Sequence, residues 1–191
     1  MRGERGDSAL DRIRDLLDTS RGQDWAFVPR SRLTEAALLA WEAEYGVSLP
    51  EEYRLFLREI GDGGVMPGSY CDFEVSALAG VWGAPTAAQP FPLTAECVRE
   101  RLRRLTDEGH PDDGVLFAEL KPIWKADGQP PGCVVFGQYP SADSLFLVTA
   151  GDLRGSVWCG VCYGVPETKG GEFVGFLDWF ADVLAEFEGG A

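Results

Sequence analysis

The residue types that could carry out chemistry are sparse in this chain and are not spaced for a recognisable reaction. His110 is the only histidine, and no nucleophile and acid are spaced to build a catalytic triad with it. Asp112, Asp113 and Glu119 could support acid-catalysed hydrolysis or cation binding, but their spacing provides neither paired carboxylates at a cleft nor a set of oxygen ligands. Residues 61–64 are glycine-rich but follow a predicted helix, which indicates a helix end and not a phosphate-binding loop. We therefore expect no catalytic residue, no cofactor and no metal.

The five cysteines are expected to be buried free thiols. An odd number of cysteines in a chain of this length, without a secretory signal, argues against a disulfide framework. Cys159 and Cys162 have the spacing of a zinc or redox motif, but the surrounding β-branched and aromatic residues predict a strand. Side chains three positions apart on a strand point to opposite faces, so we do not expect this pair to hold a metal.

Composition and charge favour a protein partner over nucleic acid or a membrane. The 191 residues are 45% hydrophobic and 25% charged, as in an ordinary domain with one core. A net charge of −14 with only 17 basic residues is the opposite of what phosphate binding requires. The acid excess is greatest over residues 111–191, which favours a basic partner but is equally the kind of charge that keeps a domain soluble. The chain has neither an apolar run long enough to span a bilayer nor a signal-like start, so we expect a cytoplasmic protein.

The spacing of apolar residues predicts helices first, strands in the middle and a helix last. Helices are predicted over residues 8–18, from Thr34 to Gly46, directly after Leu49 with Pro50 at the first helical position, from Thr94, and over about 172–188. Strands are predicted over residues 70–78, 81–82, 115–124, 133–139, 144–149 and 156–163, with the last two joined as a hairpin. This order predicts a single α+β domain, in which an N-terminal helix hairpin packs on a mainly antiparallel sheet with a C-terminal helix. The charged residues of the helix after Leu49, which include Glu52 and Arg54, and the arginines of the helix from Thr94 are expected on solvated helix faces. The glycines of residues 61–64 are expected to supply positive φ angles.

The sequence of the predicted helix hairpin, together with the turn after it, resembles that of a known family. Its distinguishing residues are Gly46, Leu49, Pro50, Tyr53, Phe56, Leu57, Asp62, Gly63 and Gly64. This run resembles the signature of the SUKH superfamily, whose members include the fungal cell-wall regulators of the SMI/KNR type. The family pattern usually has asparagine before the two glycines, where this chain has Asp62. The likeness extends over about residues 30–188, and residues 1–29 form an added helix and its connection.

The resemblance implies a non-enzymatic binding module, in bacteria most often an immunity protein that neutralises a cognate toxin by stoichiometric binding. Many such toxins are nucleases with basic grooves, which fits the acidic C-terminal part of this chain. A regulatory scaffold or signalling adaptor without a toxin is the alternative. The motif residues are expected to build the fold, and recognition is expected on the sheet face and its loops. The candidate partner contacts are Asp112, Asp113, Trp124, Asp127, Asp143 and Asp152.

Overall fold

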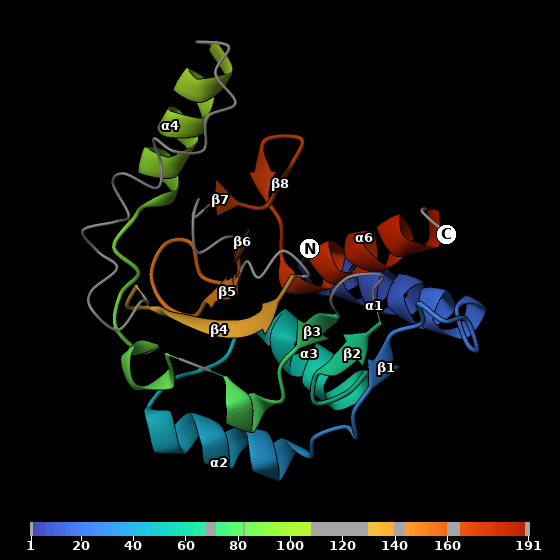
Figure 1. The fold of residues 1–191 in the computed structure, drawn as a ribbon. Coiled ribbons are helices and arrows are strands. Elements are labelled where there is room, and N and C mark those ends of the chain that lie inside the picture. The colour runs from blue at the N-terminus through green and yellow to red at the C-terminus, as the bar shows by residue number, and fades with distance from the viewer. Residues whose placement is uncertain are drawn as a thin grey trace.

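An antiparallel sheet with helices around it forms the fold, which is described from a computed structural model for residues 2–67, 72–81, 83–107, 130–139, 144–159 and 165–189 (Figure 1). The helices in these ranges are α1 (Arg2–Thr19), α2 (Glu35–Tyr45), α3 (Glu51–Glu59), α4 (Ala95–Asp107) and α6 (Phe176–Gly189), with short 3-10 turns η1 (Leu78–Gly80) and η2 (Ala84–Thr86). The main sheet contains β1 (Val28–Pro29), β2 (Gly64–Met66), β3 (Phe73–Val75), β4 (Cys133–Gln138), β5 (Ser144–Val148), β6 (Val157–Cys159) and β7 (Val165–Pro166). A separate hairpin contains β8 (Thr168–Lys169) and β9 (Glu172–Phe173). The predicted α+β class is confirmed.

The strands of the main sheet follow one another in chain order, and every neighbouring pair is antiparallel. The later strands β4 to β7 follow one another through short connections, whereas α2 and α3 lie between β1 and β2, and α4 lies between β3 and β4. The predicted hairpin between β5 and β6 is confirmed, with Phe146 paired to Trp158. Among the described residues, no helix combines the length and apolar character that a membrane span requires.

Both faces of the central strands are buried, because side chains alternate between two cores. The larger core, shared with α1, α3 and α6, receives Val134, Phe136, Leu145, Leu147 and Val157. The smaller core, shared with the start of α4, receives Cys133, Phe146, Val148 and Trp158. The expectation that a sheet face is open for recognition is therefore wrong for β4, β5 and β6.

The outermost strands of the main sheet, β1 and β7, each contain a proline on the solvent side of the backbone ladder. The residue after each proline, Arg30 or Glu167, donates its N–H into the sheet at 2.9 Å. Because inward and outward N–H groups alternate along an antiparallel strand, Pro29 and Pro166 stand where an N–H would point away from the sheet. Neither edge presents that donor to another strand.

Helix α1 belongs to the core even though it precedes the predicted hairpin. Ala9, Leu10 and Ile13 are buried, and α1 lies along α6 (Figure 1). Arg12 also forms a 2.7 Å ion pair with Asp182 on α6. The added N-terminal helix therefore packs as an integral part of the structure.

Several predicted boundaries are wrong. Helix α1 begins at Arg2 and not at residue 8, and within the described residues 72–78 the strand predicted over 70–78 is limited to β3, with η1 following it. The closing helix begins at Phe176, because positive φ angles at Gly170 and Gly171 turn the preceding residues into the β8–β9 hairpin. Strands β1 and β2 were not predicted. The strand predicted over 115–124 and the end of that over 156–163 lie outside the described residues.

Candidate functional site

The α2–α3 hairpin begins and ends where its residue types predict, with one exception. The Thr34 hydroxyl accepts the N–H of Ala37 at 3.2 Å, and Gly46 ends α2 with a φ of 64°. Pro50 was expected to be the first helical residue, but α3 begins at Glu51 and Pro50 is the N-cap. Its backbone is extended, with a ψ of 140°, and its carbonyl accepts the first helical hydrogen bond, which is the N-cap role.

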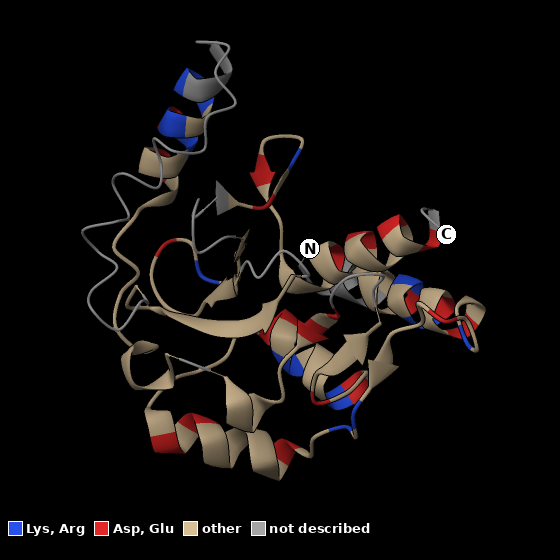
Figure 2. Cartoon of the chain, in the orientation of Figure 1, with Lys and Arg blue, Asp and Glu red and all other residues tan. Residues whose placement is uncertain are grey.

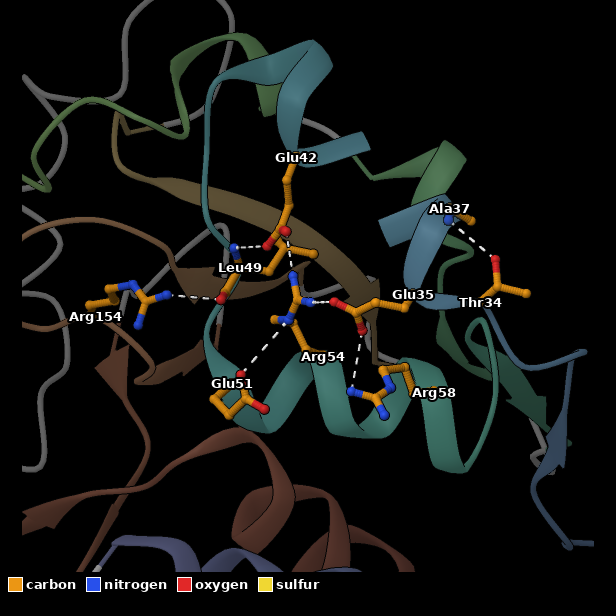
Figure 3. Close-up of polar contacts among 9 residues, drawn as sticks. All are labelled: Thr34, Glu35, Ala37, Glu42, Leu49, Glu51, Arg54, Arg58 and Arg154. Atoms are coloured by element: carbon orange, nitrogen blue, oxygen red, sulfur yellow. Dashed lines mark hydrogen bonds and ion pairs between the residues drawn. The ribbon is translucent and has the colours of Figure 1, made fainter. Parts of the chain in front are cut away.

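Arg54 joins α2 to α3 through its guanidinium group. Its N–H groups donate to the carboxylates of Glu42 and Glu35 on α2, and its Nε lies 3.8 Å from Glu51 (Figure 3). Arg58 adds a 3.2 Å ion pair to Glu35. The Arg54 side chain is only 13% exposed, so its expected place on the wet face of α3 is wrong. The hydrogen bond to Glu42 and the nearby carboxylates raise the pKa of Arg54, despite the opposing effect of burial.

Glu42 is the buried carboxylate of this network. One of its oxygens accepts the N–H of Leu49 at 2.7 Å, and the other accepts from Arg54. The Leu49 carbonyl in turn accepts from Arg154 at 2.8 Å, so the β5–β6 connection contacts the same link (Figure 3). A buried charge is tolerated when its oxygens are hydrogen-bonded in this way. The network therefore fixes α2 relative to α3.

Glu52 connects α3 to the closing helix. Its Oε2 accepts the N–H of Leu177 at 3.2 Å, in the first turn of α6, where a carboxylate is favoured by the helix dipole. A Cβ on Gly175 would lie 2.3 Å from the same oxygen, so a larger residue there would displace the Glu52 carboxylate from this position. Glu52 was also expected to remain wet, and its contact with α6 corrects that expectation.

The turn after α3 needs its two glycines for different reasons. Gly63 has a φ of 72°, and a Cβ there would lie 2.3 Å from the carbonyl oxygen of Val75. Gly64 belongs to β2, and a Cβ there would lie 2.4 Å from a ring carbon of Phe27. We expected both glycines to supply a positive φ, and only Gly63 does. Asp62, in place of the usual asparagine, accepts a backbone N–H at the start of η1 at 2.6 Å.

The apolar motif residues build the core, as expected. Tyr53, Phe56 and Leu57 are fully buried, and Leu49 is nearly so. The Phe176 ring of α6 lies 4.7 Å from Tyr53 and 5.0 Å from Phe56, measured between ring centroids. The Tyr53 hydroxyl has no hydrogen-bond partner among the described residues, and burial raises its pKa above the usual range. These residues form the framework of the hairpin and leave its outer surface free to vary.

Of the predicted partner contacts, only Asp152 lies within the described residues. Its Oδ2 accepts the N–H of Ala95 at 2.8 Å, so this exposed carboxylate caps the start of α4. Its role is at least partly structural. The other predicted contacts lie outside the described residues and stay predictions: Asp112, Asp113, Trp124, Asp127 and Asp143.

Three of the four arginines of α4 contact carboxylates, in keeping with the interpretation of this row as a solvated helix face, and the Arg101 Nε donates to the Cys97 sulfur at 3.3 Å. Arg99 lies 3.5 Å from Glu172 and 5.0 Å above the centre of the Phe173 ring. Arg103 and Arg104 both contact Glu100, and the hydrogen bond from Arg104 is the main cause that lowers the pKa of Glu100. An open hollow beside this face is lined by equal numbers of acids and arginines, so its charge selects neither sign of ligand.

The described cysteines are thiols with different surroundings. Cys133 is fully buried, and burial raises its pKa to about 12, so it is unreactive. Cys97 and Cys159 are half-buried, which corrects the expectation of complete burial. Cys71 and Cys162 lie outside the described residues. Within the described part of the chain, no group of three or more histidine, cysteine or acidic side chains is placed to hold a metal ion.

The network around Arg54 contains the contacts of the candidate site that the sequence analysis missed. Glu35 and Glu42 are seven residues apart on α2, a spacing that places both on one side of a helix. That spacing, together with the arginines of α3, could have predicted ion pairs between the two helices.

Comparison with known proteins gives one match. The model of the SMI1 / KNR4 family (SUKH-1) matches residues 32–187. The matched range contains the whole α2–α3 hairpin, the main sheet from β2 onward and most of α6, and it leaves out α1. No curated protein matches the chain.

Proposed function

Because the chain belongs to the SMI1 / KNR4 family (SUKH-1), we propose that it is a non-enzymatic binding module, and more specifically an immunity protein that neutralises a basic toxin by stoichiometric contact. The family match over residues 32–187 is the observation that carries this proposal. The net charge of −14 supports a basic partner, because complementary charge accelerates encounter and selects against acidic partners.

The binding test uses the protein product of a neighbouring gene that encodes a large secreted toxin. Co-expression of this chain with that product is expected to give a stable complex of one copy each, observed by native mass spectrometry. Cells that make both proteins are expected to survive a toxin dose that kills cells making the toxin alone. Absence of both the complex and the protection would refute the immunity role. Binding without protection, or a neighbouring gene that encodes no toxin, would favour the regulatory scaffold.

The proposed contacts at Asp112 and Asp113 have their own test. Reversing both charges to lysine is expected to slow association with the toxin, more strongly at low salt than at high salt. The matched control reverses Asp15 and Asp24, which are exposed acids with no ion pair among the described residues. Equal association rates for the two double variants would show that residues 112–113 do not contact the partner.

A further inference from the structure

Helix α2 exposes an apolar face on the side away from the core. Its inner side is held by Leu38 and Glu42, which are both buried. The other, exposed side includes Glu44 and four apolar residues at helical spacing, which are here called the α2 outer face: Ala36, Leu39, Ala40 and Ala43. A surface helix of a globular protein normally places charged or polar residues on this side. The face is therefore apolar surface without a partner among the described residues of the chain.

Leu39 provides the large side chain of the α2 outer face. It is 53% exposed, and Val28 on β1 is the other large apolar side chain exposed among the described residues. The three alanines around Leu39 leave the helix backbone accessible, so a second helix could pack closely with Leu39 seated between its side chains. The caps at Thr34 and Gly46, with the Arg54 network, hold the face in place before any partner arrives.

The charges beside the face select the sign of the partner. Helix α2 contains three glutamates and no lysine or arginine (Figure 2). Glu35 and Glu42 are neutralised by arginines of α3, whereas Glu44 is exposed without an ion pair among the described residues. A second copy of this chain would bring the same acids against them.

We propose that the α2 outer face docks an amphipathic helix of the partner whose apolar stripe is flanked by lysine or arginine. This inference rests on the proposed function and names the surface and the kind of partner element. Apolar contact at Leu39 supplies the anchor, and a flanking cation meets Glu44. The central strands are already covered on both faces, whereas the α2 outer face is exposed. Binding at α2 therefore leaves the packing of the sheet unchanged.

The test uses the full chain and three synthetic peptides of about 18 residues, since isolated helices shorter than roughly 15 residues are marginal. The first peptide contains leucine and lysine arranged as an amphipathic helix. The second has the same composition in scrambled order, and the third replaces each lysine by glutamate. Binding is measured by isothermal titration for the wild type, Leu39→Gln and Ala40→Lys, with Val28→Gln as the control for an exposed apolar residue elsewhere. Circular dichroism establishes that each variant is folded.

The amphipathic lysine peptide is expected to bind the wild type and Val28→Gln with equal affinity. Its Kd is expected to rise at least about tenfold for Leu39→Gln and Ala40→Lys. The scrambled and glutamate peptides are expected to bind at least about tenfold more weakly than the amphipathic one. Absence of binding, equal binding of the scrambled peptide, or no loss with Leu39→Gln would overturn the proposal.

Sedimentation velocity tests the other occupant, a second copy. A dimer of the wild type that Leu39→Gln dissociates would overturn the proposal in favour of self-association. The outcome for α2 is separable from the outcome for the proposed function. If the Leu39→Gln variant forms the toxin complex as tightly as the wild type does, the immunity role is retained and the docking surface is refuted.

Discussion

Replacing Glu42 by alanine removes two contacts from the buried side of α2 at once. The N–H of Leu49, now 2.7 Å from a Glu42 oxygen, loses its acceptor, and an unsatisfied buried donor costs about 1–3 kcal/mol. The hydrogen bond from Arg54 to the carboxylate also disappears, and such charged hydrogen bonds contribute about 1.5–3 kcal/mol. Arg54 still contacts Glu35 and Glu51, so we expect a net loss of about 3 kcal/mol, below the full sum.

Urea unfolding followed by tryptophan fluorescence measures this loss. The control is Glu44→Ala on the exposed side of the same helix, for which we expect a change within about 0.5 kcal/mol. A double-mutant cycle with Arg54→Met is expected to give a coupling free energy of about 1–3 kcal/mol between positions 42 and 54. Equal losses for Glu42→Ala and Glu44→Ala, or a coupling near zero, would refute the assignment of Glu42 as the acceptor that holds α2.

Three further perturbations follow from the contacts. Gly63→Ala is expected to lower the free energy of unfolding in urea by about 3–5 kcal/mol, because it combines a left-handed φ with a clash against Val75. Gly46→Ala has the φ penalty alone and is expected to lower it by about 1 kcal/mol. Equal losses for the two variants would contradict the role of the Val75 clash. Burial, and to a lesser extent the neighbouring Glu186, raises the pKa of Glu167, so the folded state binds the proton of this carboxyl more tightly than the unfolded state does. The free energy of unfolding is therefore expected to fall as pH rises from about 4 through the folded pKa. Glu167→Gln should remove that fall, whereas Glu188→Gln, at an exposed position, should retain it. Asp152→Ala is expected to destabilise the chain by about 1 kcal/mol in thermal unfolding, because it removes the carboxylate that caps α4, and Asp152→Asn is expected to destabilise it by less. Identical melting temperatures for the wild type and both variants would show that this cap contributes nothing to stability.

Local signals predicted the α2–α3 hairpin well, because its caps depend on residues a few positions apart. Thr34, Gly46 and the apolar stripe from Tyr53 to Leu57 act within their own helices, so the sequence pattern is sufficient to find them. The strands β4 and β5 were found for the same reason, since long runs of β-branched and aromatic residues leave few alternatives.

The missed features depend on contacts between distant segments. Arg54 and Glu52 lie on a helix face that the apolar stripe marks as wet, and only the positions of α2 and α6 show that both are bonded. Strands β1 and β2 contain two and three residues, which is too short for an alternating pattern to be recognised. The acidic candidate contacts were chosen by charge, and charge does not distinguish a helix cap such as Asp152 from a free carboxylate.

The prolines at the two outer strands limit how this protein can associate. A strand of another molecule that pairs with β1 or β7 would lack the backbone N–H donor at the proline position. The prolines therefore disfavour intermolecular pairing at both edges of the sheet. A partner bound at either edge would therefore have to be held by side-chain contacts and not by continued strand pairing.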